Sequence, residues 1–282
     1  MPELPEVETV VRGLRSVAKD YVVAYIKFYR KDLRQPIPIE DIKKILMYQK
    51  LQQINRRAKY ILMETVNGCA ILHLGMSGRF ICLPSSKPQF AHTHMVMGLS
   101  QKTKNPTLYL HYIDPRRFGV ICAQKASEPL DKHRCFSHLG VEPLDCRSLA
   151  TVLYEKGLKS KRNIKALIMD AEVVVGVGNI YACEALFTAG IHPQSPTQLL
   201  KKSEYIKLAA EIKKVLRNAI KKGGTTLKDF RSSDNNSGYF QLQLKVYGRE
   251  DEACNICKAD IVRISQSGRS SWFCKNCQKI AT

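Results

Sequence analysis

Four cysteines near the C-terminal end of the chain constrain its fold more than any other feature. Cys254 and Cys257 form one Cys-x2-Cys pair, Cys274 and Cys277 form another, and sixteen residues separate the two pairs. This spacing lets two knuckles close on one tetrahedral Zn²⁺ with a β-hairpin between them. Since sulfur fills all four positions, we expect one structural Zn²⁺ that folds residues 246–280, a module too small to build its own core.

The charge of the chain predicts a polyanionic partner. Its 282 residues carry 45 Lys and Arg against 25 Asp and Glu, a formal net charge of +20. At a hydrophobic content of 44%, such an excess is typical of a folded protein that binds nucleic acid. No apolar run in the sequence has the length of a membrane span, and the start lacks a signal-peptide pattern, so we expect a soluble intracellular protein.

The spacing of apolar residues changes along the chain and predicts an α+β multidomain protein. Helical spacing over 5–18 predicts a first helix, and short alternating runs over 21–124, with one helix near 41–47, predict a β-sandwich or barrel. Beyond residue 125, helical spacing returns and predicts a bundle, followed by a Gly, Ser and Asn-rich loop. The predicted bundle helices are 148–156, 164–171, 178–189 and 203–221. The predicted domains are 1–125, 126–240 and 246–280.

The first residues, Met1-Pro2-Glu3, combine an amine with a carboxylate. Removal of Met1 would expose a secondary amine whose reference pKa is about 7.7–8.0, against about 10.4 for lysine, so much of it would be free base at neutral pH. Pro2 is then a candidate nucleophile that forms an iminium with a sugar carbon, and Glu3 is a candidate proton shuttle. The same residues are also typical of a helix start, and both interpretations stay open here.

Two glycine-bounded turns in the β half present large apolar side chains. Met76 lies in a Gly-Met-Ser-Gly turn, and Phe118 follows Arg116 in an Asp-Pro-Arg-Arg-Phe-Gly turn. Taken singly, either side chain could belong to a core. On turns flanked by Gly and Arg, both favour the interpretation of wedges that enter a base stack. Basic residues around Lys59 are predicted to alternate on the two faces of a strand.

The second half offers candidate phosphate contacts. A Gly-Val-Gly turn precedes Asn179 at the start of a predicted helix, where backbone amides can bind a phosphate. The full dinucleotide fingerprint is absent from the sequence, so a Rossmann site is rejected. Arg269 on the zinc hairpin is either a phosphate contact or a solvated tip. The six scattered cysteines are expected to be reduced and mostly buried thiols: Cys69, Cys82, Cys122, Cys135, Cys146 and Cys183.

Across essentially its whole length the sequence resembles bacterial formamidopyrimidine-DNA glycosylase. The residues that carry the resemblance are 1–9, 57–60, 73–78, 114–119, 174–181, 223–230 and the four-cysteine module. Leu4, where the related endonuclease VIII has glycine, and the turn at 114–119 favour this branch. The resemblance implies an N-terminal β-sandwich domain with flanking helices, a helix-two-turns-helix domain and a C-terminal zinc β-hairpin.

The resemblance also assigns roles to individual residues. It implies that Pro2 is the Schiff-base nucleophile, Glu3 its acid/base partner, Lys59 an aid to β-elimination and Arg269 a phosphate contact that assists δ-elimination. It further implies that eight residues contact DNA: His73, Met76, His92, Arg116, Phe118, Lys161, Lys165 and Asn179. Among them, Arg116 would form a hydrogen bond with the orphaned cytosine. Which basic side chain of residues 159–165 meets phosphate stays open, as do the base-reading residues of the loop at 225–239.

The function implied is a DNA glycosylase with lyase activity at abasic sites. It would excise 8-oxoguanine opposite cytosine and formamidopyrimidines from double-stranded DNA, with no catalytic metal and no organic cofactor. We expect a monomer in the bacterial cytoplasm, associated with the nucleoid and with no membrane partner. Two alternatives remain: an endonuclease VIII-like specificity for oxidised pyrimidines, and a non-enzymatic zinc-dependent protein that binds damaged DNA.

Overall fold

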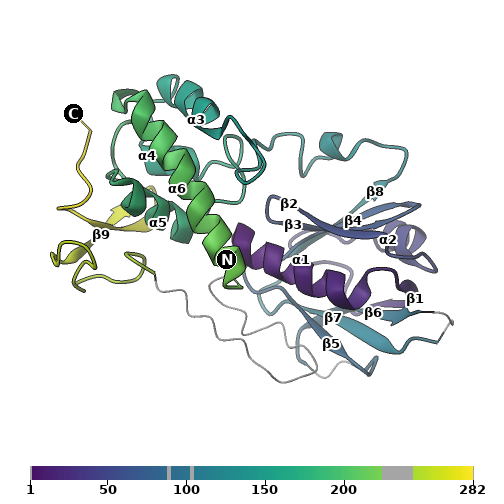
Figure 1. Ribbon diagram of the computed structural model, residues 1–282. Coiled ribbons are helices and arrows are strands. Elements are labelled where there is room, and N and C mark those ends of the chain that lie inside the picture. Colours follow the sequence, from purple (N-terminus) through teal and green to yellow (C-terminus); the bar gives the residue numbers. More distant parts are fainter. Residues whose placement is uncertain (1, 88–89, 102–104, 224–243, 282) are drawn as a thin grey trace. The chain divides into compact units, whose positions relative to one another are not determined.

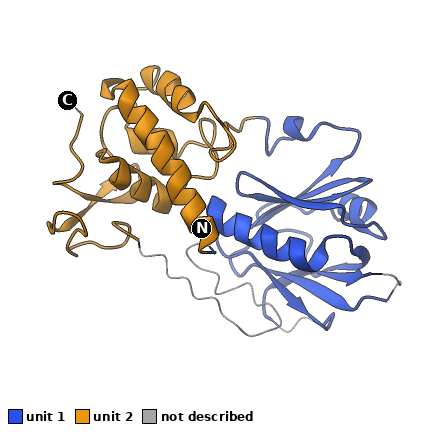
Figure 2. Cartoon of the chain, viewed as in Figure 1, with its two compact units in different colours: residues 1–137, 223–240 blue, residues 138–222, 241–282 orange. Residues whose placement is uncertain are grey.

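The computed structural model describes residues 2–87, 90–101, 105–223 and 244–281. These form two compact units (Figure 2). Unit 1 contains the described residues up to 137, and unit 2 contains residues 138–222 and those from 244 onwards. The loop predicted over 223–238 and the base-reading residues expected at 225–239 lie, but for Gly223, outside the described residues.

Unit 1 is built on two four-stranded antiparallel sheets, as the alternating sequence pattern predicts (Figure 1). One sheet has the order β1-β6-β7-β5 and the other has the order β2-β3-β4-β8. The strands are β1 (Val22–Phe28), β2 (Gln53–Arg57), β3 (Tyr60–Thr65), β4 (Gly68–His73), β5 (Arg79–Leu83), β6 (Thr93–Ser100), β7 (Leu108–Ile113) and β8 (Val120–Lys125). Buried side chains from both sheets share one core, which makes this unit the predicted sandwich.

Helix α1 (Leu4–Ala18) adds an apolar face to that core. Val7, Val11 and Leu14 recur at helical spacing and are almost fully buried. On its polar side, Glu8 pairs with Arg56 of β2 at 3.1 Å, and Arg15 donates to the backbone oxygen of Ile54. Arg15, near the C-terminal end of α1, contacts Ile54 near the start of β2, whereas Glu8, nearer the N-terminus of the helix, contacts Arg56 near the end of the strand. The N-terminal end of α1 is therefore directed toward the end of β2.

Unit 1 extends beyond the boundary at residue 125 that the sequence suggests. After β8, the chain passes through a short 3₁₀ helix, η1 (Leu130–Lys132), and packs back onto the sandwich. Arg134 donates to Gln35, and the ring of Phe136 lies edge-on to that of Tyr60 at 5.3 Å. The remaining helix, α2 (Ile39–Leu46), packs against β4, β8 and β1 and corresponds to the predicted helix near 41–47.

Unit 2 is the predicted helical bundle. Its helices are α3 (Leu149–Leu158), α4 (Ile164–Ile168), α5 (Asn179–Ala189), η2 (Thr197–Leu199) and α6 (Lys202–Lys221). Helix α6 packs on α3 and α5, and its buried Tyr205 donates to the Thr197 backbone oxygen at 2.8 Å. Helix α4 ends earlier than the predicted 164–171. The Asp170 carboxylate accepts from the backbone N–H of Glu172, which favours a turn over a further helical residue.

A β-hairpin completes unit 2 between the two cysteine pairs, as predicted. Strands β9 (Ile261–Gln266) and β10 (Arg269–Cys274) pair in antiparallel register. Both turn residues, Ser267 and Gly268, have positive φ angles of 51° and 71°, the requirement of a type I′ turn. Among the described residues, none of the helices combines the length and apolar character that crossing a membrane requires.

Candidate active site and nucleic-acid interface

The N-terminus is held by a reciprocal capping box at the start of α1. The Glu3 backbone N–H donates to Glu6 Oε2 at 2.9 Å, and the Glu3 carboxylate accepts the Glu6 backbone N–H. Glu3 is 3% exposed, so its carboxylate is fixed beside the helix end. Pro2 is half-buried and immediately precedes this cap. The predicted helix start is therefore confirmed, whereas the reactivity of Pro2 and Glu3 stays a prediction.

Lys59 lies in a tight turn at the end of β2 toward which α1 is directed. Arg57 and Tyr60 form the closing pair of the β2–β3 hairpin, which leaves Ala58 and Lys59 as its two-residue loop. Ala58 has a φ of 53°. The predicted placement of Lys59 within a strand is thus wrong. Lys59 is partly exposed in this turn.

His73 lies at the same edge of the sheet as Lys59. It pairs with Tyr60 across β3 and β4, and the two rings lie 4.8 Å apart. Its Nδ1 accepts the Gly75 backbone N–H at 3.0 Å, which leaves the ring proton on Nε2. Burial and then the positive charges of Lys59 and Arg34 lower the pKa of His73 to about 4. The imidazole is therefore a neutral N–H donor at physiological pH, suited to a phosphate oxygen.

The two predicted wedge turns pack directly against each other. Gly75 has a φ of 61°, and any side chain there would collide with the backbone carbonyl of Phe118. The Arg116 backbone N–H donates to Ser77 Oγ at 3.2 Å. The turn at 75–78 and the turn at 114–119 therefore form one rigid surface feature.

The buried carboxylate of Asp114 holds the two turns together. Oδ1 accepts from Ser77 Oγ at 2.6 Å, and Oδ2 accepts from the Gly119 backbone N–H at 2.7 Å. The Asp114 backbone adds two more contacts, with its N–H bonded to the His92 oxygen and its carbonyl bonded to the His94 ring at 2.8 Å. Sequence reasoning located this turn but did not assign a role to Asp114 or Ser77.

The braced turns present the side chains expected to contact DNA. Met76 and Phe118 are each 42% exposed. The Arg116 guanidinium lies over the Phe118 ring, 4.8 Å from its centroid. His92 is exposed and has a φ of 64°. The interpretation of Met76 and Phe118 as core residues is therefore wrong.

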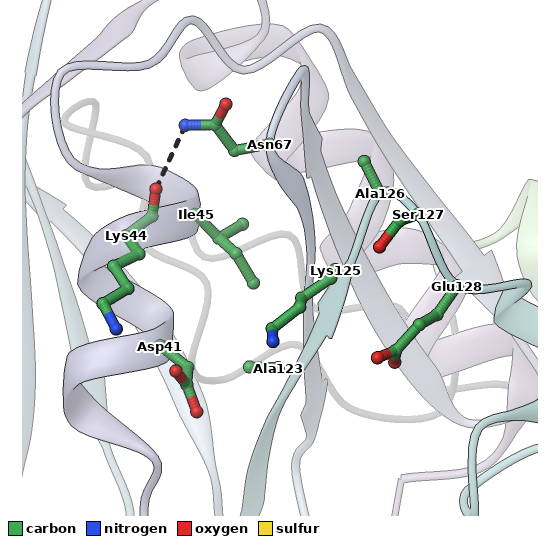
Figure 3. A pocket seen from close by; sticks show the side chains of 9 residues that line it. All are labelled: Asp41, Lys44, Ile45, Asn67, Ala123, Lys125, Ala126, Ser127 and Glu128. Atoms are coloured by element: carbon green, nitrogen blue, oxygen red, sulfur yellow. Dashed lines mark hydrogen bonds between the residues drawn. The ribbon is translucent and has the colours of Figure 1, made fainter.

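A separate pocket of about 430 Å³ opens between α2 and the end of β8 (Figure 3). Asp41 and Lys44 line it from the helix, and Lys125 lines it from the strand. In the pairing of β4 with β8, Lys125 is opposite Gly68, whereas His73 is opposite Val120. The pocket therefore lies at the far end of these strands from His73 and contains none of the predicted site residues.

In unit 2, two predicted DNA contacts converge on the zinc hairpin. Lys165 is 3% exposed, and its ammonium donates to the Ser270 backbone oxygen at 3.0 Å and to Ser271 Oγ at 2.6 Å. The Asn179 amide donates to the same Ser270 oxygen at 3.0 Å. Both side chains therefore fix the residue next to Arg269, which itself is exposed at the first position of β10. This positioning role was not foreseen from the sequence.

Two adjacent basic residues before α4, Lys161 and Arg162, differ in their contacts. Arg162 is engaged in an ion pair of 2.7 Å with Asp170 and donates to Ser160 as well. Both side chains are exposed, and phosphate contact by Lys161 stays a prediction.

The four clustered cysteines lie together as a metal site. All four Sγ atoms are within 4.8 Å of one another, with 3.9 Å between Cys254 and Cys277 and 3.4 Å between Cys257 and Cys274. A tetrahedral Zn²⁺ with Zn–S bonds of about 2.3 Å requires sulfur atoms about 3.8 Å apart, so the donor set fits this ion. The module is anchored to α5 by Glu184, whose buried carboxylate accepts three consecutive backbone N–H groups from Lys245, Val246 and Tyr247.

Fold and site together define a class of DNA-repair proteins with a zinc finger. Residues 1–121 match the model of the formamidopyrimidine-DNA glycosylase N-terminal domain, and residues 139–231 match that of its H2TH domain. Residues 251–280 match the zinc finger found in FPG and IleRS. The chain belongs to the formamidopyrimidine-DNA glycosylase family.

Curated relatives and solved structures agree with this assignment along the full length. The chain is 45% identical to formamidopyrimidine-DNA glycosylase from Photorhabdus laumondii and 42% identical to that from Ruthia magnifica, over 99% of this chain and 100% of each relative. A Lactococcus lactis FPG variant in complex with Fapy-dG containing DNA has a TM-score of 0.86 at 32% identity, covering 99% of this chain and 100% of that one. The L. lactis Fpg complex with abasic-site DNA has a TM-score of 0.85 at 31% identity, covering 98% of this chain and 99% of that one.

Proposed function

We propose that this protein is a bifunctional DNA glycosylase and abasic-site lyase that removes 8-oxoguanine opposite cytosine and formamidopyrimidines. The observation that carries the proposal is the capped N-terminus, where Pro2 precedes the buried carboxylate of Glu3 at the helix end directed toward the Lys59 turn. Family membership and the likeness to complexes with Fapy-dG and abasic-site DNA support the same activity.

Access to the damaged base requires its extrusion from the duplex. Unstacking costs roughly a few kcal/mol, and a side chain that fills the vacated space offsets part of that cost. Met76 and Phe118 are exposed on turns that Asp114 holds in place, so little conformational entropy is lost when they enter a base stack. Arg116 is proposed to bond the orphaned cytosine, and its contact with Phe118 orients it for that role.

The chemistry we propose begins with the secondary amine of processed Pro2. Its lone pair attacks C1′ of the extruded nucleotide, the C1′–N bond breaks, and the base leaves with that electron pair and the proton of the amine. The C1′–O4′ bond then breaks, O4′ keeps that electron pair and takes up a proton, and the C1′–N double bond of an iminium forms. The resulting iminium withdraws electrons, so a proton is lost from C2′ and the 3′ C–O bond breaks; a second elimination breaks the 5′ C–O bond. Glu3 is proposed to shuttle protons, Lys59 to contact the lesion phosphates, and Arg269 to hold phosphate during the second elimination.

Borohydride trapping on an 8-oxoguanine duplex tests this proposal. Reduction of the iminium should give a covalent protein–DNA adduct, and peptide mapping should place it on residue 2. Pro2→Leu is the matched control, because a large second residue retains Met1 and removes the secondary amine. Absence of an adduct with the processed protein would refute the proposed glycosylase activity. A protein that binds damaged DNA without catalysing base removal would then be the better explanation. Stronger trapping on thymine-glycol duplexes would instead indicate a preference for pyrimidines.

A further inference from the structure

A second cluster of soft ligands lies in unit 1, distinct from the four-cysteine module. Cys122, His133 and Cys135 each offer a ligand atom, and these atoms lie within 4.8 Å of one another. Cys122 belongs to β8, while His133 and Cys135 follow η1 in the segment that packs back onto the sandwich. We propose that these three residues form a second Zn²⁺ site, independent of the proposed glycosylase activity.

The separation of the two sulfur atoms fits a metal ion. Cys122 Sγ and Cys135 Sγ are 3.9 Å apart, the same distance as between Cys254 and Cys277 in the zinc module. Tetrahedral coordination with Zn–S bonds of about 2.3 Å requires about 3.8 Å between sulfurs. A disulfide requires about 2.05 Å, so the pair would have to move together for that bond to form.

The third ligand lies close to both sulfurs, since a ring nitrogen of His133 is within 4.8 Å of each of them. His133 Nδ1 carries the lone pair of the neutral ring and accepts the backbone N–H of Cys135 at 3.2 Å, a long hydrogen bond that a metal ion would replace. Two thiolates and one imidazole are a donor set that suits Zn²⁺.

The surroundings also favour a deprotonated sulfur. Arg134 Nη2 lies 3.7 Å from Cys122 Sγ. Zn²⁺ binding would form two Zn–S bonds and one Zn–N bond and release the protons of the two thiols. Arg134 is exposed and also bonded to Gln35, so its N–H groups can continue to donate to a metal-bound thiolate.

Three protein ligands leave one coordination position for water or a small anion. The site borders Tyr60, whose pKa is raised to about 12 by burial and then by the neighbouring Cys135. Tyr60 also stacks on His73 and directly follows Lys59. Metal bound here would therefore stiffen the segment after β8 against the hairpin that carries Lys59.

Metal content of the full-length protein tests the proposal. After equilibration with Zn²⁺ and desalting, we expect two zinc ions per chain in the unmodified protein and one in Cys122→Ser and Cys135→Ser. Cys146→Ser is the matched control, since that cysteine lies outside the cluster and should leave two. One zinc per chain in the unmodified protein, or no difference between it and the cluster variants, would overturn the site.

A second measurement on the unmodified protein covers the case in which the variants do not fold. Alkylation of individual thiols, mapped by mass spectrometry, should be slowed at Cys122 and Cys135 by added Zn²⁺ and unchanged at Cys146. Equal alkylation of the pair with and without Zn²⁺ would contradict the proposal, as would recovery of the two residues as a disulfide that Zn²⁺ does not prevent.

Discussion

Ser77 Oγ donates a hydrogen bond of 2.6 Å to the fully buried carboxylate of Asp114 and thereby joins the turn that carries Met76 to the turn that carries Phe118. Gly75 completes the contact because its α-carbon lies against the Phe118 carbonyl. The two exposed apolar side chains are thus held by one buried charge.

Removal of the Ser77 hydroxyl should destabilise the protein and impair lesion removal. A hydrogen bond to a charged group contributes about 1.5–3 kcal/mol, and Ser77→Ala would leave a buried carboxylate oxygen without its partner. Denaturant unfolding should show a loss of that size. Ser127→Ala, at an exposed serine, should change the unfolding free energy by no more than about 0.5 kcal/mol. An equally small change of the unfolding free energy in both variants would contradict a stabilising role for the Ser77–Asp114 hydrogen bond.

Met76→Ala and Phe118→Ala should impair base removal without unfolding the protein. Both side chains are 42% exposed, so their loss creates no cavity. Contact of a side chain with the base stack contributes about 1–3 kcal/mol, so excision of 8-oxoguanine should fall at least about fivefold. Cleavage at a preformed abasic site should fall less, because no base has to be extruded. Ile206→Ala, at a 54% exposed apolar residue of α6, is the control.

His73 should make stability depend on pH below neutrality. Its folded-state pKa of about 4 lies below the unfolded value of about 6.5, so the unfolded chain binds more protons between these pH values. The unfolding free energy should therefore decline as pH falls from about 6.5 toward about 4. In His73→Asn, whose side-chain oxygen replaces the Nδ1 acceptor, the decline should be shallower. Parallel pH profiles for the two proteins would exclude this contribution.

Glu184→Gln should loosen the zinc module. The substitution removes the charge that accepts three backbone N–H groups and leaves an amide that cannot satisfy them equally. We expect loss of at least about 2 kcal/mol, given the strength of charge-assisted hydrogen bonds. Release of Zn²⁺ to a chelator should become faster. Glu155→Gln, at an exposed position of α3, should release Zn²⁺ at the unmodified rate.

Zinc removal should weaken DNA binding while leaving unit 1 folded. The four cysteines draw about thirty residues together around one ion, and the exposed Arg269 is on the hairpin between them. Cys257→Ser should therefore reduce affinity for an abasic-site duplex by at least about tenfold, measured at constant salt. Retained affinity in a metal-free protein would contradict a role for the hairpin in DNA contact.

Local patterns in the sequence were sufficient for much of the fold. The apolar spacing of Val7, Val11 and Leu14 predicted α1 to within a residue, and the cysteine spacing predicted the β9–β10 hairpin. Both signals arise from neighbours along the chain. The misplacement of Lys59 has the same origin, because a two-residue turn at a non-glycine position carries little local signal.

Contacts between distant segments were not predictable in this way. Lys165 had the sequence character of an exposed phosphate contact, yet it is buried against Ser270 and Ser271, more than a hundred residues away. Asp114 and Ser77 are 37 residues apart in the sequence, and only the fold brings them together. The proximity of Cys122 and Cys135 depends on the path of the chain after β8, which no periodicity encodes.

The acceptor shared by Lys165 and Asn179 is a backbone carbonyl, not a side chain. Every amino acid at position 270 supplies that oxygen, so substitutions there preserve the hold on the hairpin. Substitution of residue 270 should consequently leave the position of Arg269 unchanged. We therefore expect no covariation between residue 270 and either Lys165 or Asn179, although both side chains form a direct hydrogen bond with the backbone of that residue.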